Sequence, residues 1–165
     1  MSFDAMEPNQ LLELLYQGLE SWTKARQGYL SLAGDPGDVL EALVDGPSTF
    51  RVVLHWAGDK DNTEQALGGI VDNTFEVWLL KSKGLRLKPG EHLIRGNPPF
   101  LKLLSDLRAQ IRSLEFPEEV TNRYLLYKGA DQMDPALALQ VPTTGWKMTF
   151  EITTALPGIE HAVAL

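Results

Sequence analysis

The chain has 165 residues, 44% of them hydrophobic, which is the size and composition of one folded domain. It contains no cysteine, so a disulfide framework and thiolate metal sites are excluded, and no apolar run approaches the ~18 residues of a membrane span. The formal net charge of −7 argues against binding to a phosphate backbone, so nucleic acid is not an expected direct partner. Without a membrane span, a membrane is not an expected partner either.

The charge is unevenly distributed along the chain. Residues 1–48 carry eight acidic side chains against two basic ones, a net charge of −6, whereas residues 81–112 carry eight basic against two acidic ones, a net charge of +6. Opposite patches on one small domain can attract each other within the molecule or between copies of it. The second case is how head-to-tail subunits recognise each other and close into rings.

The N-terminal part predicts one long helix over residues 9–28, followed by a connector. Asn9 can cap this helix, and an apolar stripe recurs along it at helical spacing, formed by Leu12, Leu15, Leu19 and Trp22. Residues 33–37 then break the chain, and Asp38 can cap a short helical turn that stops at Gly46-Pro47. The N-terminus, with Asp4 and Glu7, lacks the basic start of a secretory signal, so we expect the protein to stay inside a cell.

Two strands are predicted next. From Thr49 to Ala57 apolar residues alternate with other residues, which indicates a strand with one strongly apolar face. A polar loop is expected from Gly58 to Gly69. Residues 70–83 form the longest strand candidate; both of its faces are partly apolar, so we expect it to be central in the sheet.

The C-terminal half predicts a second helix and two or three strands. Asn97-Pro98-Pro99 can start a helix whose apolar positions recur until Pro117, and these are Phe100, Leu104, Leu107, Ile111 and Leu114. Strand candidates follow at residues 123–128, 137–141 and 146–154. The sequence therefore predicts an α+β fold, a mixed or antiparallel sheet of four to five strands with two main helices packed on one face.

No catalytic, cofactor or metal motif is apparent. His55, His92 and His161 lie far apart and have no second ligand at metal-binding spacing. The loop with Asp59, Asp61 and Glu64 lacks the glycine and the final carboxylate of a calcium loop, since Glu64 and Ile70 occupy those positions. We therefore expect neither an enzyme nor a bound cofactor or metal.

The C-terminal end differs from the rest of the chain. We expect a single domain over residues 1–156 and an arm over residues 157–165, in which five of nine residues are apolar. Such an end is either a disordered terminus or an arm whose apolar side chains are covered by a neighbouring subunit. Trp78 lies on the face of its strand opposite the alternating apolar residues, and we expect it to face a second helix or a partner.

This order of elements resembles the tail terminator and tail completion proteins of tailed bacteriophages. The similarity covers nearly the whole chain and lies in its size, its order of elements and its residue patterns. These patterns include the Phe50-Arg51-Val52-Val53-Leu54 strand and the closing strand 146–154. The resemblance implies a structural virion protein that forms a hexameric ring at the end of the tail tube. Its partners would be other copies of itself, the tail tube protein and a neck or head-completion protein, with assembly in the host cytoplasm.

The charge pattern suggests which residues would make subunit contacts. We expect contacts from the acidic first helix, from the basic stretch 81–112 and from the C-terminal arm; the candidate residues are Glu13, Glu20, Lys102, Arg108, Arg112, Ile159, Val163 and Leu165. Two kinds of alternative remain open. One is another ring component of the neck or baseplate, and the other is a small module that binds an apolar ligand between sheet and helices.

Overall fold

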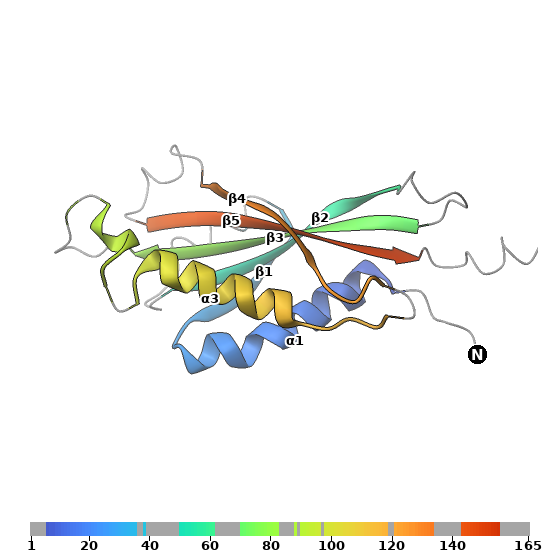
Figure 1. Cartoon of the computed structure of the whole chain (residues 1–165), viewed down its shortest axis with the longest axis horizontal. Helices are drawn as coiled ribbons and strands as arrows, with labels where there is room; N and C mark the ends of the chain where they lie inside the picture. Colours follow the sequence, from blue (N-terminus) through green and yellow to red (C-terminus); the bar gives the residue numbers. More distant parts are fainter. Residues whose placement is uncertain are drawn as a thin grey trace, which may run out of the picture.

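The structure is a computed structural model that describes residues 6–35, 38, 50–61, 70–82, 88, 90–96, 98–118, 121–133 and 143–155. Two helices, a short 3-10 turn and five strands make up this part of the chain (Figure 1). In chain order they are α1 (Pro8–Ala25), β1 (Tyr29–Ala33), β2 (Arg51–Asp61), β3 (Ile70–Ser82), η1 (Glu91–Leu93), α3 (Phe100–Ser113), β4 (Leu126–Gln132) and β5 (Thr143–Ala155).

The strands form one mixed sheet in the order β1-β2-β3-β5-β4. β1 runs parallel to β2, and every other neighbouring pair is antiparallel. β3 and β5 are the two longest strands and pair along their full length, from Ile70 opposite Ala155 to Ser82 opposite Thr143. The predicted fold class, a mixed sheet of four to five strands with two main helices, is confirmed, as is the central place of residues 70–82.

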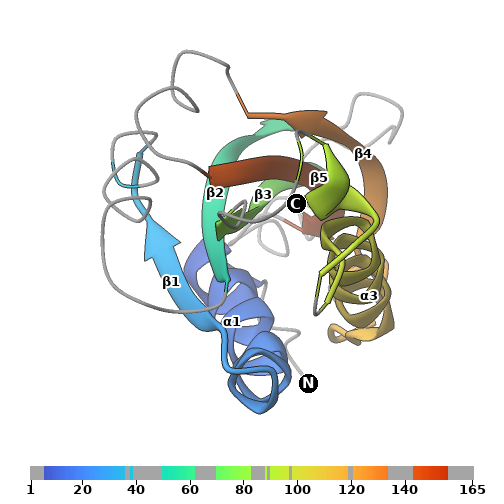
Figure 2. The same ribbon diagram turned by 90° about the vertical axis from the view of Figure 1, so that its left-hand side faces the viewer.

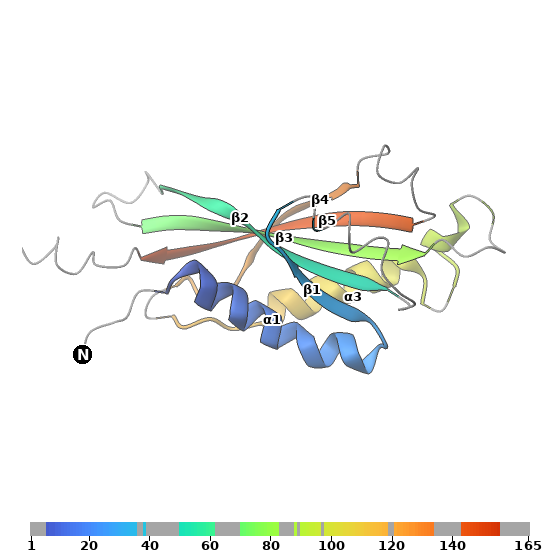
Figure 3. The same ribbon diagram turned by 180° about the vertical axis from the view of Figure 1, so that it is seen from behind.

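Both helices cover the same face of the sheet (Figures 2 and 3). The core between the helices and the sheet is mainly apolar, because the inward positions of α1 and α3 meet alternate residues of β2, β3 and β5. Burying each of these large side chains contributes roughly 1.5–3 kcal/mol. The fully buried members include Leu11, Leu15, Leu19, Val52, Leu54, Val77, Leu79, Leu107, Ile111, Met148, Phe150 and Ile152.

The start of α1 differs from the prediction. Glu7, not Asn9, occupies the N-cap position, and its backbone N–H donates to Oε1 of Gln10 at 2.9 Å in a capping box. Pro8 fits the first helical position because it has no N–H to leave unpaired. The buried stripe accordingly begins at Leu11 and not at Leu12, which is only half-buried.

The end of α1 also differs, because a strand that the sequence did not reveal follows it. The helix stops at Ala25, and Gln27 adopts a left-handed backbone with φ of 59°. The chain then reverses into β1, whose first residue, Tyr29, donates its N–H to the carbonyl oxygen of Phe50 at 3.0 Å. Pairing with β2, a contact between residues about twenty positions apart, defines this strand.

Three other boundaries shift. β2 continues through Gly58, where the register slips, to Asp61, so the expected loop starts later than Gly58. β4 covers Leu126–Gln132 and not residues 123–128. The N-cap of α3 is Pro99, and its helix ends at Ser113, four residues before Pro117. The short helix expected after Asp38 and the strand expected at 137–141 lie outside the described residues.

The other face of the sheet carries a smaller apolar cluster. Ala33, Val53, Leu80 and Met133 are buried there, with Trp78 packed against them. Trp78 therefore faces away from both helices, and Nζ of Lys147 lies 5.5 Å from the centre of its ring. Its expected contact with a second helix is wrong for α1 and α3, and the alternative, a contact with a partner, stays a prediction.

Candidate subunit interface

The contact between α1 and α3 determines which sides of the two helices remain available to partners. Nε2 of Gln110 donates to the carbonyl oxygen of Gly18 at 3.2 Å, and a Cβ built on Gly18 would lie 2.6 Å from Cδ2 of Leu114. Gly18 on α1 and Gln110 on α3 therefore mark the sides that face each other. The glycine permits this close approach because it has no side chain.

The acidic candidates lie on the far side of α1. Glu13 and Glu20 are both exposed. With 3.6 residues per helical turn, Glu20 lies about 200° and Glu13 about 220° around the helix from Gly18. Both carboxylates therefore point away from α3. Because α1 packs beneath β1 and β2, the side of this helix that faces away from α3 is its β1 side (Figure 2).

Two of the basic candidates lie on the far side of α3. Arg108 is about 160° and Arg112 about 200° around this helix from Gln110. The guanidinium carbon of Arg108 lies 5.2 Å from the centre of the Tyr127 ring on β4, which fixes the direction of this flank. Arg112 follows one turn later and is exposed. These two charges therefore lie on the β4 side of the helix layer.

Lys102 does not belong to this group. It lies about 120° around α3 from Arg108, and its Nζ is 3.3 Å from Oδ2 of Asp106 on the same helix. The structure thus brings Arg108 and Arg112 together and places Lys102 elsewhere. The three candidates of the C-terminal arm, Ile159, Val163 and Leu165, lie outside the described residues, and their role stays a prediction.

Within the described part of the chain, no ion pair joins the acidic residues 6–35 to the basic residues of 81–112. The pairs formed by Arg95 and Lys102 are with Glu91 and Asp106, their own neighbours four residues away. The acidic flank of α1 and the basic flank of α3 point away from each other across the helix pair. Among the described residues, the two flanks therefore do not neutralise each other.

Exposed apolar side chains accompany the charges at both ends of the sheet. On β1, Tyr29 is 52% and Leu32 is 53% exposed, and at the other end Leu126 of β4 is also 53% exposed. Single exposed apolar residues are ordinary, but these three lie on the two outermost strands. Each end of the sheet thus combines a charged helix flank with exposed apolar surface.

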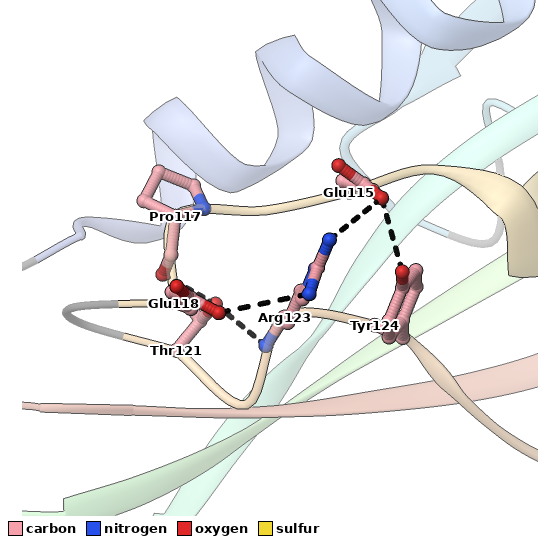
Figure 4. Close-up of polar contacts among 6 residues, drawn as sticks. All are labelled: Glu115, Pro117, Glu118, Thr121, Arg123 and Tyr124. Carbon is pink, nitrogen blue, oxygen red and sulfur yellow. Dashed lines mark hydrogen bonds and ion pairs between the residues drawn. The ribbon is translucent and has the colours of Figure 1, made fainter.

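A polar cluster that the sequence did not reveal precedes β4 (Figure 4). Oε1 of Glu115 accepts hydrogen bonds from Nη2 of Arg123 and from the hydroxyl of Tyr124, both at 3.0 Å. The Tyr124 hydrogen bond, followed by Arg123, lowers the pKa of the Glu115 carboxyl, and the same hydrogen bond raises the pKa of Tyr124. Arg123 also approaches Glu118 at 3.7 Å.

This cluster depends on the path of the loop. Arg123 has a φ of 73°, and its N–H bonds to Oγ1 of Thr121, whose hydroxyl donates to the carbonyl oxygen of Pro117 at 2.7 Å. The partners are eight and nine residues apart, a spacing that matches no helix or strand period. No sequence pattern could therefore have identified it.

One small cavity of about 320 Å³ lies where η1 meets the ends of β4 and β5. Its lining includes His92, Leu93, Thr144 and Trp146, and the His92 ring bonds to the Thr144 hydroxyl. No three His, Asp or Glu side chains in the described ranges gather into a metal-binding group. None of the described helices is long and apolar enough to cross a bilayer.

Comparison with known proteins gives no family. No protein-family model and no curated protein matches the chain. Among solved structures, two nucleotide-free forms of the catalytic domain of the histidine kinase ThkA are similar, each at 12% identity over 95% of this chain and 99% of that chain. Their TM-scores are 0.36 and 0.32, values at which the similarity supports no conclusion about function.

Proposed function

We propose that this protein is a structural component of a tailed-phage virion, a tail terminator that assembles into a ring at the end of the tail tube and joins the tail to the head. The observation that carries the proposal is the separation of the two charged flanks. Glu13 and Glu20 lie on one side of the helix layer, and Arg108 and Arg112 lie on the other. The size and element order that resemble this class of protein add support.

The separation favours a head-to-tail arrangement. A surface that meets a different surface on the next copy forms a heterologous interface, and such interfaces give rings when the rotation between copies closes. A two-fold dimer would instead bring one flank against its own copy, so that like charges would repel. The proposed ring is a hexamer, in which each acidic flank meets the basic flank of its neighbour.

The charges would determine the orientation in which copies meet more than the affinity between them. Exposed ion pairs contribute about 0–1 kcal/mol each, so burial of apolar side chains such as Leu32 and Leu126 has to provide much of the association free energy. The net charge of −7 on each subunit would also weaken adhesion of DNA to the ring. The proposed partners are therefore other copies, the tube protein and a neck protein.

The test is the size of the purified chain, followed by imaging with tail tubes. Light scattering at low and high salt should show a ring, or an association that weakens as salt screens the flanks. Electron micrographs should show the protein at one end of the tubes. A monomer at all concentrations and salts that also leaves tubes unchanged would contradict the proposal.

The cavity beside His92 supports the second candidate, a small ligand-binding module. A cavity of this size can hold a small molecule, and its lining combines Trp146 and Leu93 with polar groups. The same preparation distinguishes the candidates. A monomer whose melting temperature rises with an added small molecule would favour this module over the ring.

A further inference from the structure

The two outer strands of the sheet have unpaired edges within the described residues. β1 pairs only with β2, and β4 pairs only with β5. An open edge presents backbone N–H and C=O groups that can bond to a strand of another chain. β1 has no charged residue, no proline and no bulge, which are the features by which proteins protect such edges.

The backbone of β1 shows which groups are available. Because Tyr29 donates its N–H toward β2, the peptide groups of Leu30 and Leu32 point to the outer side. Leu32 is 53% exposed, and within the described residues no other strand pairs with this edge. Pairing there would leave every β1 to β2 hydrogen bond in place.

The strand directions allow a second copy to continue the sheet. Across the sheet from β1 to β4, the strand direction reverses three times, at the β2–β3, β3–β5 and β5–β4 pairs. β4 therefore runs antiparallel to β1 within one molecule. If the next copy keeps the same orientation, its β4 meets the first copy's β1 as an antiparallel pair. Antiparallel pairing is the more common geometry between strands.

Continuing the sheet in this way also aligns the helices. α1 lies beneath β1 and β2, and α3 lies at the β4 end (Figure 2). A junction between β1 and the next copy's β4 therefore places the flank with Glu13 and Glu20 beside the flank with Arg108 and Arg112. Charge complementarity and edge pairing select the same neighbour.

We infer that subunits join by pairing the β1 edge of one copy with the β4 edge of the next, which continues the sheet from subunit to subunit. The inference rests on the proposed ring and specifies its interface. The side chains agree with a central register, in which Leu30 meets Ala130 on the helix side of the sheet and Tyr29 meets Asp131 on the opposite side.

Disulfide crosslinking tests this pairing cleanly, because the chain has no cysteine of its own. The variants are Tyr29→Cys, Asp131→Cys and Leu126→Cys, made singly and in the pairs Tyr29 with Asp131 and Tyr29 with Leu126. All three positions are exposed, so the substitutions should leave the fold intact. A disulfide needs Cα atoms about 4.4–6.8 Å apart, so only paired strands will form one efficiently.

Mild oxidation of mixed Tyr29→Cys and Asp131→Cys proteins should give a dimer that contains one copy of each. The Tyr29→Cys, Asp131→Cys double variant should give a ladder that ends at one closed species, and Leu126 should crosslink with Tyr29 less efficiently. Efficient Tyr29→Cys homodimers would instead show two-fold pairing of β1 edges and overturn the inference.

Mass photometry of the same samples under reducing conditions separates the two proposals. A ring that assembles but forms no crosslink between these positions contradicts edge pairing and leaves the ring intact. A wild-type chain that assembles neither alone nor on tail tubes contradicts the ring itself.

Discussion

Gln110 of α3 donates a hydrogen bond to the carbonyl oxygen of Gly18 on α1, and this contact marks the sides on which the two helices face each other. With Gly18 and Gln110 facing each other, the sides opposite them face the two ends of the sheet. Those are the sides that carry Glu13 with Glu20 and Arg108 with Arg112. The uneven charge of the sequence thus becomes a spatial separation across the molecule.

The first prediction concerns the Glu115 cluster. Because the Tyr124 hydroxyl and Arg123 lower the pKa of Glu115, this carboxylate adds stability above the pKa it has in the unfolded chain. That contribution should be lost as the pH falls through the lowered pKa. Tyr124→Phe removes the largest cause, so the Glu115 pKa should move up toward its ordinary range.

NMR titration of the Glu115 carboxyl carbon in both proteins measures this shift. Equal Glu115 titration midpoints in the wild type and Tyr124→Phe would show that the hydroxyl does not hold the carboxylate.

The second prediction concerns the turn between α1 and β1. A Cβ on Gly28 would lie 2.3 Å from Cζ of Phe50, a core ring that is 2% exposed and cannot move aside. Gly28→Ala should therefore lower the free energy of unfolding by roughly 1–3 kcal/mol. Urea denaturation measures the change, and Ser21→Ala, on the exposed side of α1, is the matched control. An unchanged stability in Gly28→Ala would show that the chain leaves α1 by another path.

The third prediction concerns the β1 edge. Leu32→Lys places a charge on a strand edge that we expect to be covered in the ring, so it should weaken association. Ile94→Lys makes the same change at a residue of the η1 turn that is 68% exposed. Sedimentation velocity should show smaller species for Leu32→Lys only, with similar melting temperatures for both. Equal association of the two variants would exclude the edge from the interface.

Much of the fold could be predicted from the sequence. The helices and the long strands were found because apolar residues recur along them with a clear period, as at Leu104, Leu107 and Ile111 in α3. β1 was missed because five residues are too short for a period and its strand depends on pairing with β2. The Glu115 cluster also depends on tertiary contacts, because only the folded loop brings Arg123 and Tyr124 to the Glu115 carboxylate.

The candidate interface was predicted in part. Charge counts identified the acidic and basic stretches, but they could not show which charges share a flank. Lys102 and Arg108 are six residues apart, and the helix turns them to different sides. Because Lys102 pairs with Asp106 and lies outside the basic flank, Lys102→Glu serves as a control for the substitutions in that flank.

The fourth prediction tests the central claim, that subunits associate head to tail through the two flanks. One variant carries Arg108→Glu and Arg112→Glu, and the other carries Glu13→Lys and Glu20→Lys. Each should associate more weakly than the wild type, because its altered flank repels the unaltered flank of the neighbouring copy. A loss of about 1–2 kcal/mol in association free energy lowers the association constant roughly 5–30-fold. Lys102→Glu should change association far less.

The decisive measurement is the sedimentation velocity of the two variants mixed in equal amounts at low salt. Alternating copies would then match positive to negative at every junction, and a ring with an even number of subunits could close. We predict that the mixture recovers the wild-type sedimentation coefficient while each variant alone sediments as smaller species. Variants that each assemble like the wild type, or a mixture that stays as small as its components, would contradict the account.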